Sequence, residues 1–253
     1  MTLTVKDPAL SDSDHWYNRD GVPAYTVTGD NGKTRATTLR DARKHNLVPS
    51  VTTILKVVNK PGLNQWLNMQ TLLAALTLPR KPDEPETDYI NRVMEDSKAQ
   101  SKAAADTGTA IHNAIQAFYE GVVNNQYPDH VLACSNAIAL HFGEQGWVSE
   151  RSFAHEFGFG GKCDLFAPGF VLDIKTQDFT DPKAVKIYDE QLMQLAAYRV
   201  GLGMPSARCA NVFVSRTQPG LVSIHEWEEK DILRGWEMFS ALLKFWQLKT
   251  GYQ

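Results

Sequence analysis

Residues 160–176 constrain the fold most, because they predict two strands joined by a tight turn. Pro168 and Gly169 favour the turn, and the β-branched and aromatic residues on either side favour strands. With the turn centred on these two residues, counting outward places Asp164 directly opposite Asp173. A bulge that shifts the pairing by one residue is the alternative, because Pro-Gly suits a type II turn better than the primed turns of two-residue hairpins.

Two aspartates that face each other across antiparallel strands repel, since facing Cβ atoms lie about 4.5–5.5 Å apart. Side chains alternate between the faces of a strand, so Lys175 shares a face with Asp173. The lysine offsets the repulsion in part, and a divalent cation such as Mg²⁺, which prefers carboxylate oxygens, offsets it fully. The hairpin therefore predicts a metal site with a lysine beside it. An ordinary solvated hairpin face is the alternative.

Residues 87–119 predict a helix, with a break near Thr107 and Gly108. Its buried stripe follows helical spacing, at Ile111, Ala114, Ile115 and Phe118. His112 borders this stripe one turn after Gly108, where the missing side chain lets a strand or a ligand approach closely. Histidine in such a place is either a hydrogen-bonded structural residue or a ligand, and the spacing leaves both open.

A later helix is predicted over residues 188–199, following the helix-start signal at residues 181–182. Gln191, Gln194 and Tyr198 share one stripe of this helix, and leucines occupy the adjoining stripe. A row of neutral hydrogen-bonding side chains is less common there than a charged row. It indicates either a binding surface or a half-buried helix edge.

Composition excludes several classes of protein. The chain has 253 residues, no apolar run of membrane-spanning length, and no signal-peptide core at its start. Its three cysteines lack Cys-x-x-Cys spacing, which argues against zinc and iron–sulfur sites and suits a reducing compartment. The net charge of −3 does not indicate a broad basic surface, although a local basic groove remains compatible with it.

The order of predicted elements defines the fold class. From residue 105 it is helix, helix, three strands, helix, two strands and helix, which predicts an α/β fold with a mixed central sheet flanked by helices. Residues 1–102 predict a hairpin, with its turn at residues 30–32, and a mainly helical region packed on the core. The core itself is predicted to span residues 103–253.

Several motifs in this order resemble the PD-(D/E)XK nuclease superfamily, whose core is restriction-endonuclease-like. More closely they resemble its RecB-type exonuclease branch, which includes small phage and mitochondrial exonucleases. The match covers about residues 103–215, and the motifs are weak singly but specific as a set. They are Asp164 with Asp173, Ile174 and Lys175 on the hairpin, Gly108 and His112 on the preceding helix, and Gln194 and Tyr198 on the following helix.

The resemblance implies a role for each of these residues. Mg²⁺ or Mn²⁺ would be bound by Asp164, Asp173, the carbonyl of Ile174 and His112, with Glu156 on the preceding strand as an additional candidate. Lys175 would orient or activate the attacking water and stabilise negative charge. The expected catalytic set is Asp164, Asp173, Lys175, Gln194 and Tyr198, and the expected DNA contacts are Gln191, Gln194, Tyr198, Trp66, Lys102 and Lys186. No iron–sulfur cluster is expected, because the four cysteines that carry it in several relatives are missing here.

The implied activity is that of a hydrolase, a metal-dependent DNA exonuclease that cleaves phosphodiester bonds from DNA ends with single-stranded DNA threaded through the site. A hard divalent cation suits this reaction, because it generates hydroxide near neutral pH and polarises the phosphoryl group. The resemblance also implies a place in DNA recombination, repair or replication, and a cytoplasmic location in a bacterium or a phage-infected host. The implied partners are DNA and a single-strand annealing or binding protein, with no membrane.

The residues leave two other functions open. A structure-specific endonuclease of the same superfamily would cut circular DNA, which an exonuclease spares. A DNA-binding module that has lost catalysis would bind DNA without metal and without cleavage, although the intact Asp173-Ile174-Lys175 triplet argues against it.

Overall fold

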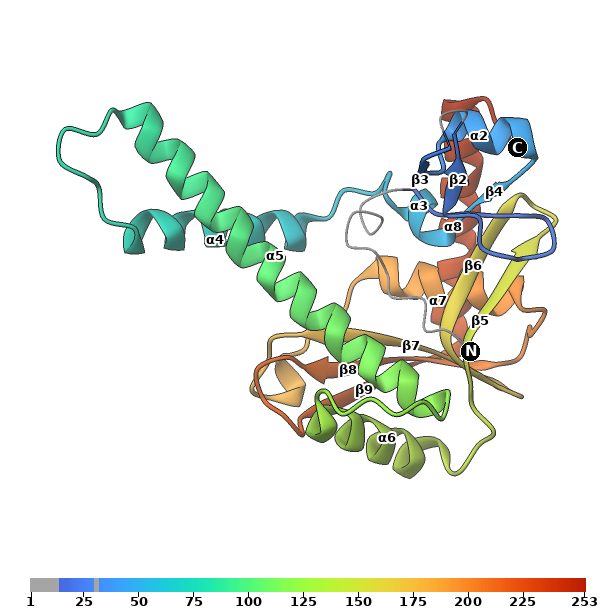
Figure 1. Cartoon of the computed structure of the whole chain (residues 1–253). Coiled ribbons are helices and arrows are strands. Elements are labelled where there is room, and N and C mark those ends of the chain that lie inside the picture. The colour runs from blue at the N-terminus through green and yellow to red at the C-terminus, as the bar shows by residue number, and fades with distance from the viewer. Residues whose placement is uncertain (1–13, 30–31) are drawn as a thin grey trace.

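A mixed five-stranded sheet forms the centre of the protein, in a computed structural model that describes residues 14–29 and 32–253 (Figure 1). The strands lie in the order β5-β6-β7-β8-β9, and only β7 and β8 are parallel among these neighbours. They are β5 (Val148–His155), β6 (Phe159–Ala167), β7 (Phe170–Gln177), β8 (Arg208–Ser215) and β9 (Val222–Trp227). The predicted α/β fold class with a mixed sheet flanked by helices is confirmed.

Helices cover both faces of this sheet. On one face lie α5 (Glu86–Tyr119) and α6 (Pro128–Phe142), and on the other lie α7 (Asp189–Gly201) and α8 (Glu229–Thr250) (Figure 1). Leu172 and Ile174 of β7 belong to the hydrophobic cluster under α5 and α6, whereas Val171 belongs to the cluster under α7 and α8. The alternation of β7 therefore assigns Asp173 and Lys175 to the face that α7 covers.

The described segment from Trp16 to Leu55 packs mainly against α7 and α8. The predicted hairpin is confirmed as β2 (Thr26–Thr28) paired with β3 (Thr34–Ala36), while Asp30 and Asn31 of its turn lie outside the described residues. It is followed by α2 (Leu39–His45) and α3 (Val51–Leu55), whose buried residues join the cluster around α7 and α8. Between them β4 (Val48–Pro49) pairs with β1 (Trp16–Tyr17).

A helical hairpin, formed by α4 (Pro61–Thr77) and the first half of α5, projects from the body as an arm (Figure 1). The predicted break of α5 at Thr107 and Gly108 is wrong, because the helix runs through without interruption. A glycine inside a helix costs only about 1 kcal/mol relative to alanine, and packing against the sheet offsets that. Helix α5 also continues across the predicted boundary between residues 102 and 103. None of the described helices is long and apolar enough to cross a membrane.

Two details of the predicted helices are corrected. Phe118 is 51% exposed, and Ala117 takes the buried position at that end of α5. The signal at residues 181–182 starts only one turn of 3-10 helix, η1 (Pro182–Ala184), in which Asp181 accepts a hydrogen bond from the Lys183 N–H. The long helix α7 begins later, at Asp189.

Candidate active site

The candidate site lies where β6 separates from β7. The pairs Ala167↔Phe170 and Leu165↔Leu172 confirm the predicted register and exclude the one-residue shift. Pairing ends at Leu165↔Leu172, so Asp164 and Asp173 are the first residues beyond the ladder. The pairing of β7 with β8 continues to Gln177↔Ser215. The sheet is thus intact on one side of β7 and open on the other.

The open side of β7 gathers three of the predicted ligands. The Ile174 N–H donates to Asp164 Oδ2 over 2.7 Å, in place of a bond to the partner strand. Because the N–H and C=O of a strand residue point to the same side, the Ile174 carbonyl faces this gap as well. His112 Nε2 lies 3.2 Å from Asp164 Oδ2. A carboxylate, an imidazole and a backbone carbonyl therefore meet at the gap.

Gly108 allows α5 to come close enough for His112 to reach Asp164. A Cβ atom added at Gly108 would lie only 2.5 Å from Thr176 Oγ1 of β7. His112 follows one helical turn later on the same side of α5. The prediction that this glycine admits a strand is confirmed.

Replacing Gly108 by alanine is expected to lower the free energy of unfolding by about 1 kcal/mol. Overpacking against Thr176 costs about 1–3 kcal/mol, and the helix preference of alanine returns about 1 kcal/mol. Urea denaturation would measure the change. In a Thr176→Ala background the same substitution should be stabilising; a loss of similar size there would show that the contact with Thr176 is not its cause.

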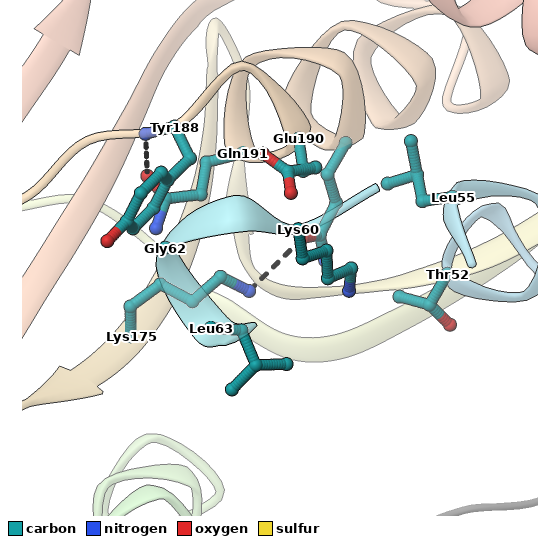
Figure 2. A pocket seen from close by; sticks show the side chains of 10 residues that line it. Thr52, Leu55, Lys60, Gly62, Leu63, Lys175, Tyr188, Glu190 and Gln191 are labelled. Carbon is teal, nitrogen blue, oxygen red and sulfur yellow. Dashed lines mark hydrogen bonds between the residues drawn. The ribbon is translucent and has the colours of Figure 1, made fainter. Parts of the chain in front are cut away.

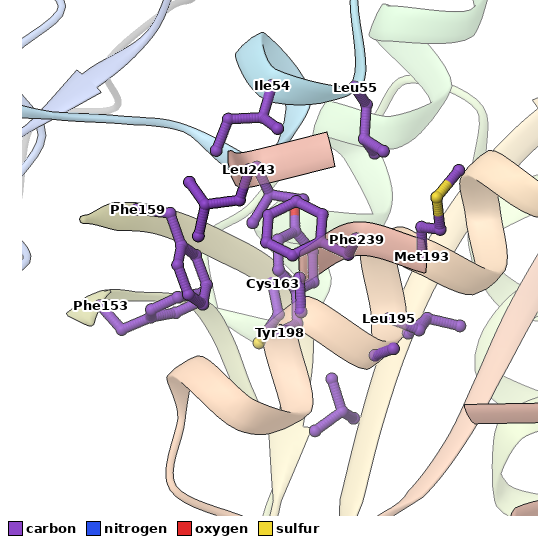
Figure 3. Close-up of a cluster of buried hydrophobic side chains, with 14 of the residues drawn as sticks. Ile54, Leu55, Phe153, Phe159, Cys163, Met193, Leu195, Tyr198, Phe239 and Leu243 are labelled. Carbon is purple, nitrogen blue, oxygen red and sulfur yellow. The ribbon is translucent and has the colours of Figure 1, made fainter. Parts of the chain in front are cut away.

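A chain of hydrogen bonds organises the face of β7 under α7. Lys175 Nζ lies 2.9 Å from Asp173 Oδ1 and 3.1 Å from Gln194 Oε1, and Gln194 Nε2 donates to the Tyr198 hydroxyl over 2.9 Å. These contacts confirm that Asp173 and Lys175 share a face. Tyr198 is 4% exposed among Phe153 and other core residues (Figure 3). Gln194 therefore orients Lys175 from the α7 side of the sheet, and Tyr198 in turn orients Gln194.

Asn211 and Trp227 also support Asp173 through hydrogen bonds. Neither residue was predicted from the sequence to belong to the site. Asn211 of β8 is fully buried and donates from Nδ2 to Asp173 Oδ2 over 2.8 Å. Its Oδ1 accepts from Trp227 Nε1, also over 2.8 Å. The sequence does contain a signal for Asn211, which is the one amide side chain in the otherwise apolar run of residues 209–214. A polar side chain buried in such a strand needs a hydrogen-bond partner.

Replacing Asn211 by leucine is expected to lower the free energy of unfolding by about 2 kcal/mol or more. The change leaves a carboxylate oxygen of Asp173 and the Trp227 N–H without partners, and each such loss costs about 1–3 kcal/mol. Urea denaturation would detect it, with Asn136→Leu at an exposed position of α6 as the matched control. Equal stabilities of the two variants would contradict the assignment.

The two aspartates have opposite pKa shifts. Burial raises the pKa of Asp173 to about 6, and the charge of Asp164 adds to this effect against the opposing charge of Lys175. Burial also favours the neutral form of Asp164, but the charge and hydrogen bond of His112, with Lys175, outweigh it and lower the pKa to about 2. Burial acts against the charged form of Lys175, and the two aspartates outweigh it and raise its pKa. Lys175 is thus an ammonium ion at neutral pH.

The donor atoms suit Mg²⁺ or Mn²⁺ in kind, since both accept carboxylate and carbonyl oxygens and Mn²⁺ also accepts imidazole. Their placement differs from the predicted single cluster. Over residues 14–29 and 32–253, no three His, Cys, Asp or Glu side chains are placed so that they could hold one metal ion. Both Asp173 oxygens accept hydrogen bonds, from Lys175 and Asn211, whereas Asp164 and His112 meet at the gap.

The predicted position of Glu156 on the strand before the hairpin is wrong. Glu156 lies in the exposed turn between β5 and β6 and not on the preceding strand. The pair His155↔Phe159 closes this turn, five residues before Asp164. Five residues of strand span about 16 Å, so Glu156 is remote from the other predicted ligands.

The remaining predicted DNA contacts are dispersed. Trp66 is half-buried on α4, Lys102 is exposed on α5, and Lys186 is exposed in the segment before α7. The Lys186 N–H donates to Gln177 Oε1, which ties that segment to the end of β7. Gln191 is half-buried at the start of α7, where its Oε1 accepts from the Tyr188 N–H.

A cavity of about 310 Å³ opens beside Lys175 (Figure 2). Its walls come from α3, the start of α4, the segment before α7 and the first turns of α7. Among the predicted site residues, Lys175, Gln191 and Gln194 line it. The structure therefore joins these three predicted residues in one concave surface.

Comparisons with known proteins give structural similarity only. No protein-family model and no curated protein matches the chain. A candidate exonuclease from Eubacterium rectale aligns with 58% of this chain and 69% of its own, at 15% identity and a TM-score of 0.41. An alkaline exonuclease from Laribacter hongkongensis aligns with 47% of this chain and 69% of its own, at 15% identity and a TM-score of 0.30.

Proposed function

We propose that the protein is a hydrolase, a metal-dependent DNA exonuclease of the RecB-type branch of the PD-(D/E)XK superfamily. One observation carries the proposal. Two aspartates and a lysine of one hairpin meet a histidine of the preceding helix and a glutamine of the following helix at the place where β6 leaves β7. Negative and positive groups linked in this way suit the binding of a cation and of a phosphodiester.

Each residue has a distinct part in the proposed reaction. Lys175 has three N–H donors, of which Asp173 and Gln194 take one each. The third is left to bind a phosphoryl oxygen and stabilise its growing negative charge. Gln194 holds the ammonium group in place, and Tyr198 holds Gln194.

A divalent cation, Mg²⁺ or Mn²⁺, would be held by Asp164, His112 and the Ile174 carbonyl, and Asp173 would join them only on giving up a hydrogen bond from Lys175 or Asn211. When bound, it lowers the pKa of water and polarises the phosphoryl group. The Ile174 N–H fixes the orientation of the Asp164 carboxylate at the gap. His112 is held nearby through the close approach of α5 to β7 at Gly108.

Single-stranded DNA is the proposed substrate, entering from an end and passing the arm. Trp66 on α4 offers an aromatic ring for base stacking, and Lys102 and Lys186 offer charges for phosphates. We place the enzyme in DNA recombination, repair or replication, in the cytoplasm of a bacterium or phage-infected host, with a single-strand annealing or binding protein as partner. The division into residues 1–102 and 103–253 also belongs to this proposal.

Cleavage of end-labelled linear DNA tests the proposal, using single- and double-stranded substrates with a closed circular control in Mg²⁺, Mn²⁺ or EDTA. We expect metal-dependent loss of linear DNA alone. Cutting of the circles would identify an endonuclease. Binding without cleavage in either metal would identify a DNA-binding module.

His112 carries a prediction about the metal. Because imidazole suits Mn²⁺ better than Mg²⁺, cleavage should proceed in Mn²⁺ at least as fast as in Mg²⁺, and His112→Ala should reduce the Mn²⁺ rate more. Initial rates in the two metals for both proteins would measure this. Activity in Mn²⁺ no greater than in Ca²⁺ would contradict the role of His112 as a ligand.

A further inference from the structure

The cavity beside Lys175 combines two kinds of wall. Leu55 of α3, Leu63 of α4 and the ring of Tyr188 supply apolar and aromatic surface, and Lys60 and Lys175 supply positive charge (Figure 2). Its volume of about 310 Å³ lies at the lower end of the range of about 300–1,000 Å³ found for ligand sites. The cavity is therefore suited to one small ligand that has a flat apolar part and an anionic part.

The ring of Tyr188 is fixed in the wall by the backbone around it. A Cβ atom added at Gly62 would lie 2.7 Å from Tyr188 Cε1, so the ring lies directly against the first turn of α4. On the other side, the Tyr188 N–H donates to Gln191 Oε1 over 3.0 Å. An aromatic ring held in this way offers a stacking surface with little loss of side-chain freedom on binding.

The charges of the cavity indicate where the anionic part lies. Lys175 keeps one N–H donor beyond its bonds to Asp173 and Gln194. Within the described part of the chain, no ion pair of Lys60 is found, so its ammonium is left for a ligand. Glu190, which also lines the cavity, disfavours a phosphate on its side. An anionic group is therefore best accommodated between the two lysines.

We propose that this cavity is a nucleoside subsite, which holds the nucleotide adjacent to the scissile phosphate with its base against Tyr188 and Leu63. The phosphate is then directed toward Lys175 and Lys60. The inference rests on the proposed function, since Lys175 is common to both. The inference adds that the enzyme binds one base next to the phosphodiester bond that it cleaves. Every base can stack on an aromatic ring, so the subsite would position the DNA strand for cleavage without selecting a particular base sequence.

Oligonucleotides with a single abasic nucleotide test this subsite. Binding of single-stranded DNA of one length, with the abasic nucleotide moved one position at a time, would be measured by fluorescence anisotropy in EDTA and in Ca²⁺. In the parent protein one position near an end should weaken binding about tenfold, the typical value of one base–aromatic stack. In Tyr188→Leu that position should lose its special penalty.

Two further variants test the same subsite if the Tyr188→Leu protein does not fold. Gly62→Ala suits the helix and displaces the ring of Tyr188, and Leu63→Ala truncates a second lining side chain, which is 48% exposed. Leu76→Ala, on the same helix at 82% exposure, is the matched control and should bind as the parent does. Thermal denaturation would confirm that each variant is folded.

The outcomes separate the subsite from the proposed function. A penalty at one position that Leu76→Ala keeps and Tyr188→Leu or Gly62→Ala loses supports the subsite, whether or not the protein cleaves DNA. Equal penalties at every position, an unchanged penalty in Tyr188→Leu, or failure to bind the oligonucleotides overturns it. Normal metal-dependent cleavage alongside such a result would leave the exonuclease assignment intact and remove only the subsite.

Discussion

Replacing Lys175 by alanine is expected to lower the rate of DNA cleavage by about 100- to 1,000-fold, the usual effect of removing one donor that stabilises transition-state charge. The ammonium group is placed for this by Asp173 and Gln194, at 2.9 and 3.1 Å. Single-turnover cleavage of end-labelled linear DNA would measure the loss. Substrate affinity should change far less, because one phosphate contact among many is removed.

The same substitution has a second expected effect, on stability. Asp173 is 1% exposed and would keep only Asn211 as a partner. Loss of a hydrogen bond to a buried charged group costs about 1–3 kcal/mol, so the melting temperature should fall. Lys183→Ala, at an exposed lysine of η1, is the matched control and should change neither quantity. A Lys175→Ala protein that keeps more than a tenth of the parent rate would contradict the assigned role.

Asp164→Asn is expected to abolish detectable cleavage and to weaken Mn²⁺ binding at least about 10- to 100-fold, the loss that follows when even a supporting partner of a ligand is removed. Asparagine has nearly the same shape, and its carbonyl oxygen can still accept from the Ile174 N–H. The substitution relieves the repulsion between Asp164 and Asp173, but it also removes the attraction of the carboxylate to His112 and Lys175, which lowers the pKa of Asp164 and stabilises the folded state at neutral pH. The fold should therefore be kept, with a lower melting temperature, while the metal is lost.

Mn²⁺ binding measured by electron paramagnetic resonance separates these effects, because it needs no substrate. The control is Asp178→Asn, which removes a carboxylate just beyond the end of β7 that is ion-paired with Arg216. It should bind Mn²⁺ like the parent. An unchanged Mn²⁺ affinity in Asp164→Asn would show that this carboxylate is structural.

The local geometry of the site was predictable because it depends on neighbours in the chain. The Pro168-Gly169 turn sets the register of the hairpin, with Gly169 at a φ of 88°, and the register sets where Asp164 and Asp173 lie. Alternation along one strand is sufficient to place Asp173 and Lys175 on one face. The close approach at Gly108 also follows from a single residue, since only glycine leaves room for it.

Contacts between distant segments were not predictable in this way. Asn211 lies 38 residues from Asp173 and reaches it only because β8 pairs with β7 in parallel. The cavity brings Lys60 and Leu63, at the start of α4, together with Tyr188, which lies in a distant segment that no local pattern relates to them. Glu156 was misplaced because the length of β5 depends on its pairing with β6, and not on its own residues.

The sequence by itself determined the order of most elements, a favoured hairpin register that puts Asp164 opposite Asp173, and the set of polar residues carried by the hairpin, α5 and α7. These depend on turn chemistry and on periods of 2 and 3.6 residues, which act within a few residues. Only the tertiary structure decided that β6 leaves β7 at Asp164, that Asn211 shares Asp173 with Lys175, and that a cavity forms beside that lysine. These features depend on packing between elements. There, the free-energy cost of burying polar groups without partners is larger than the conformational preference of single residues.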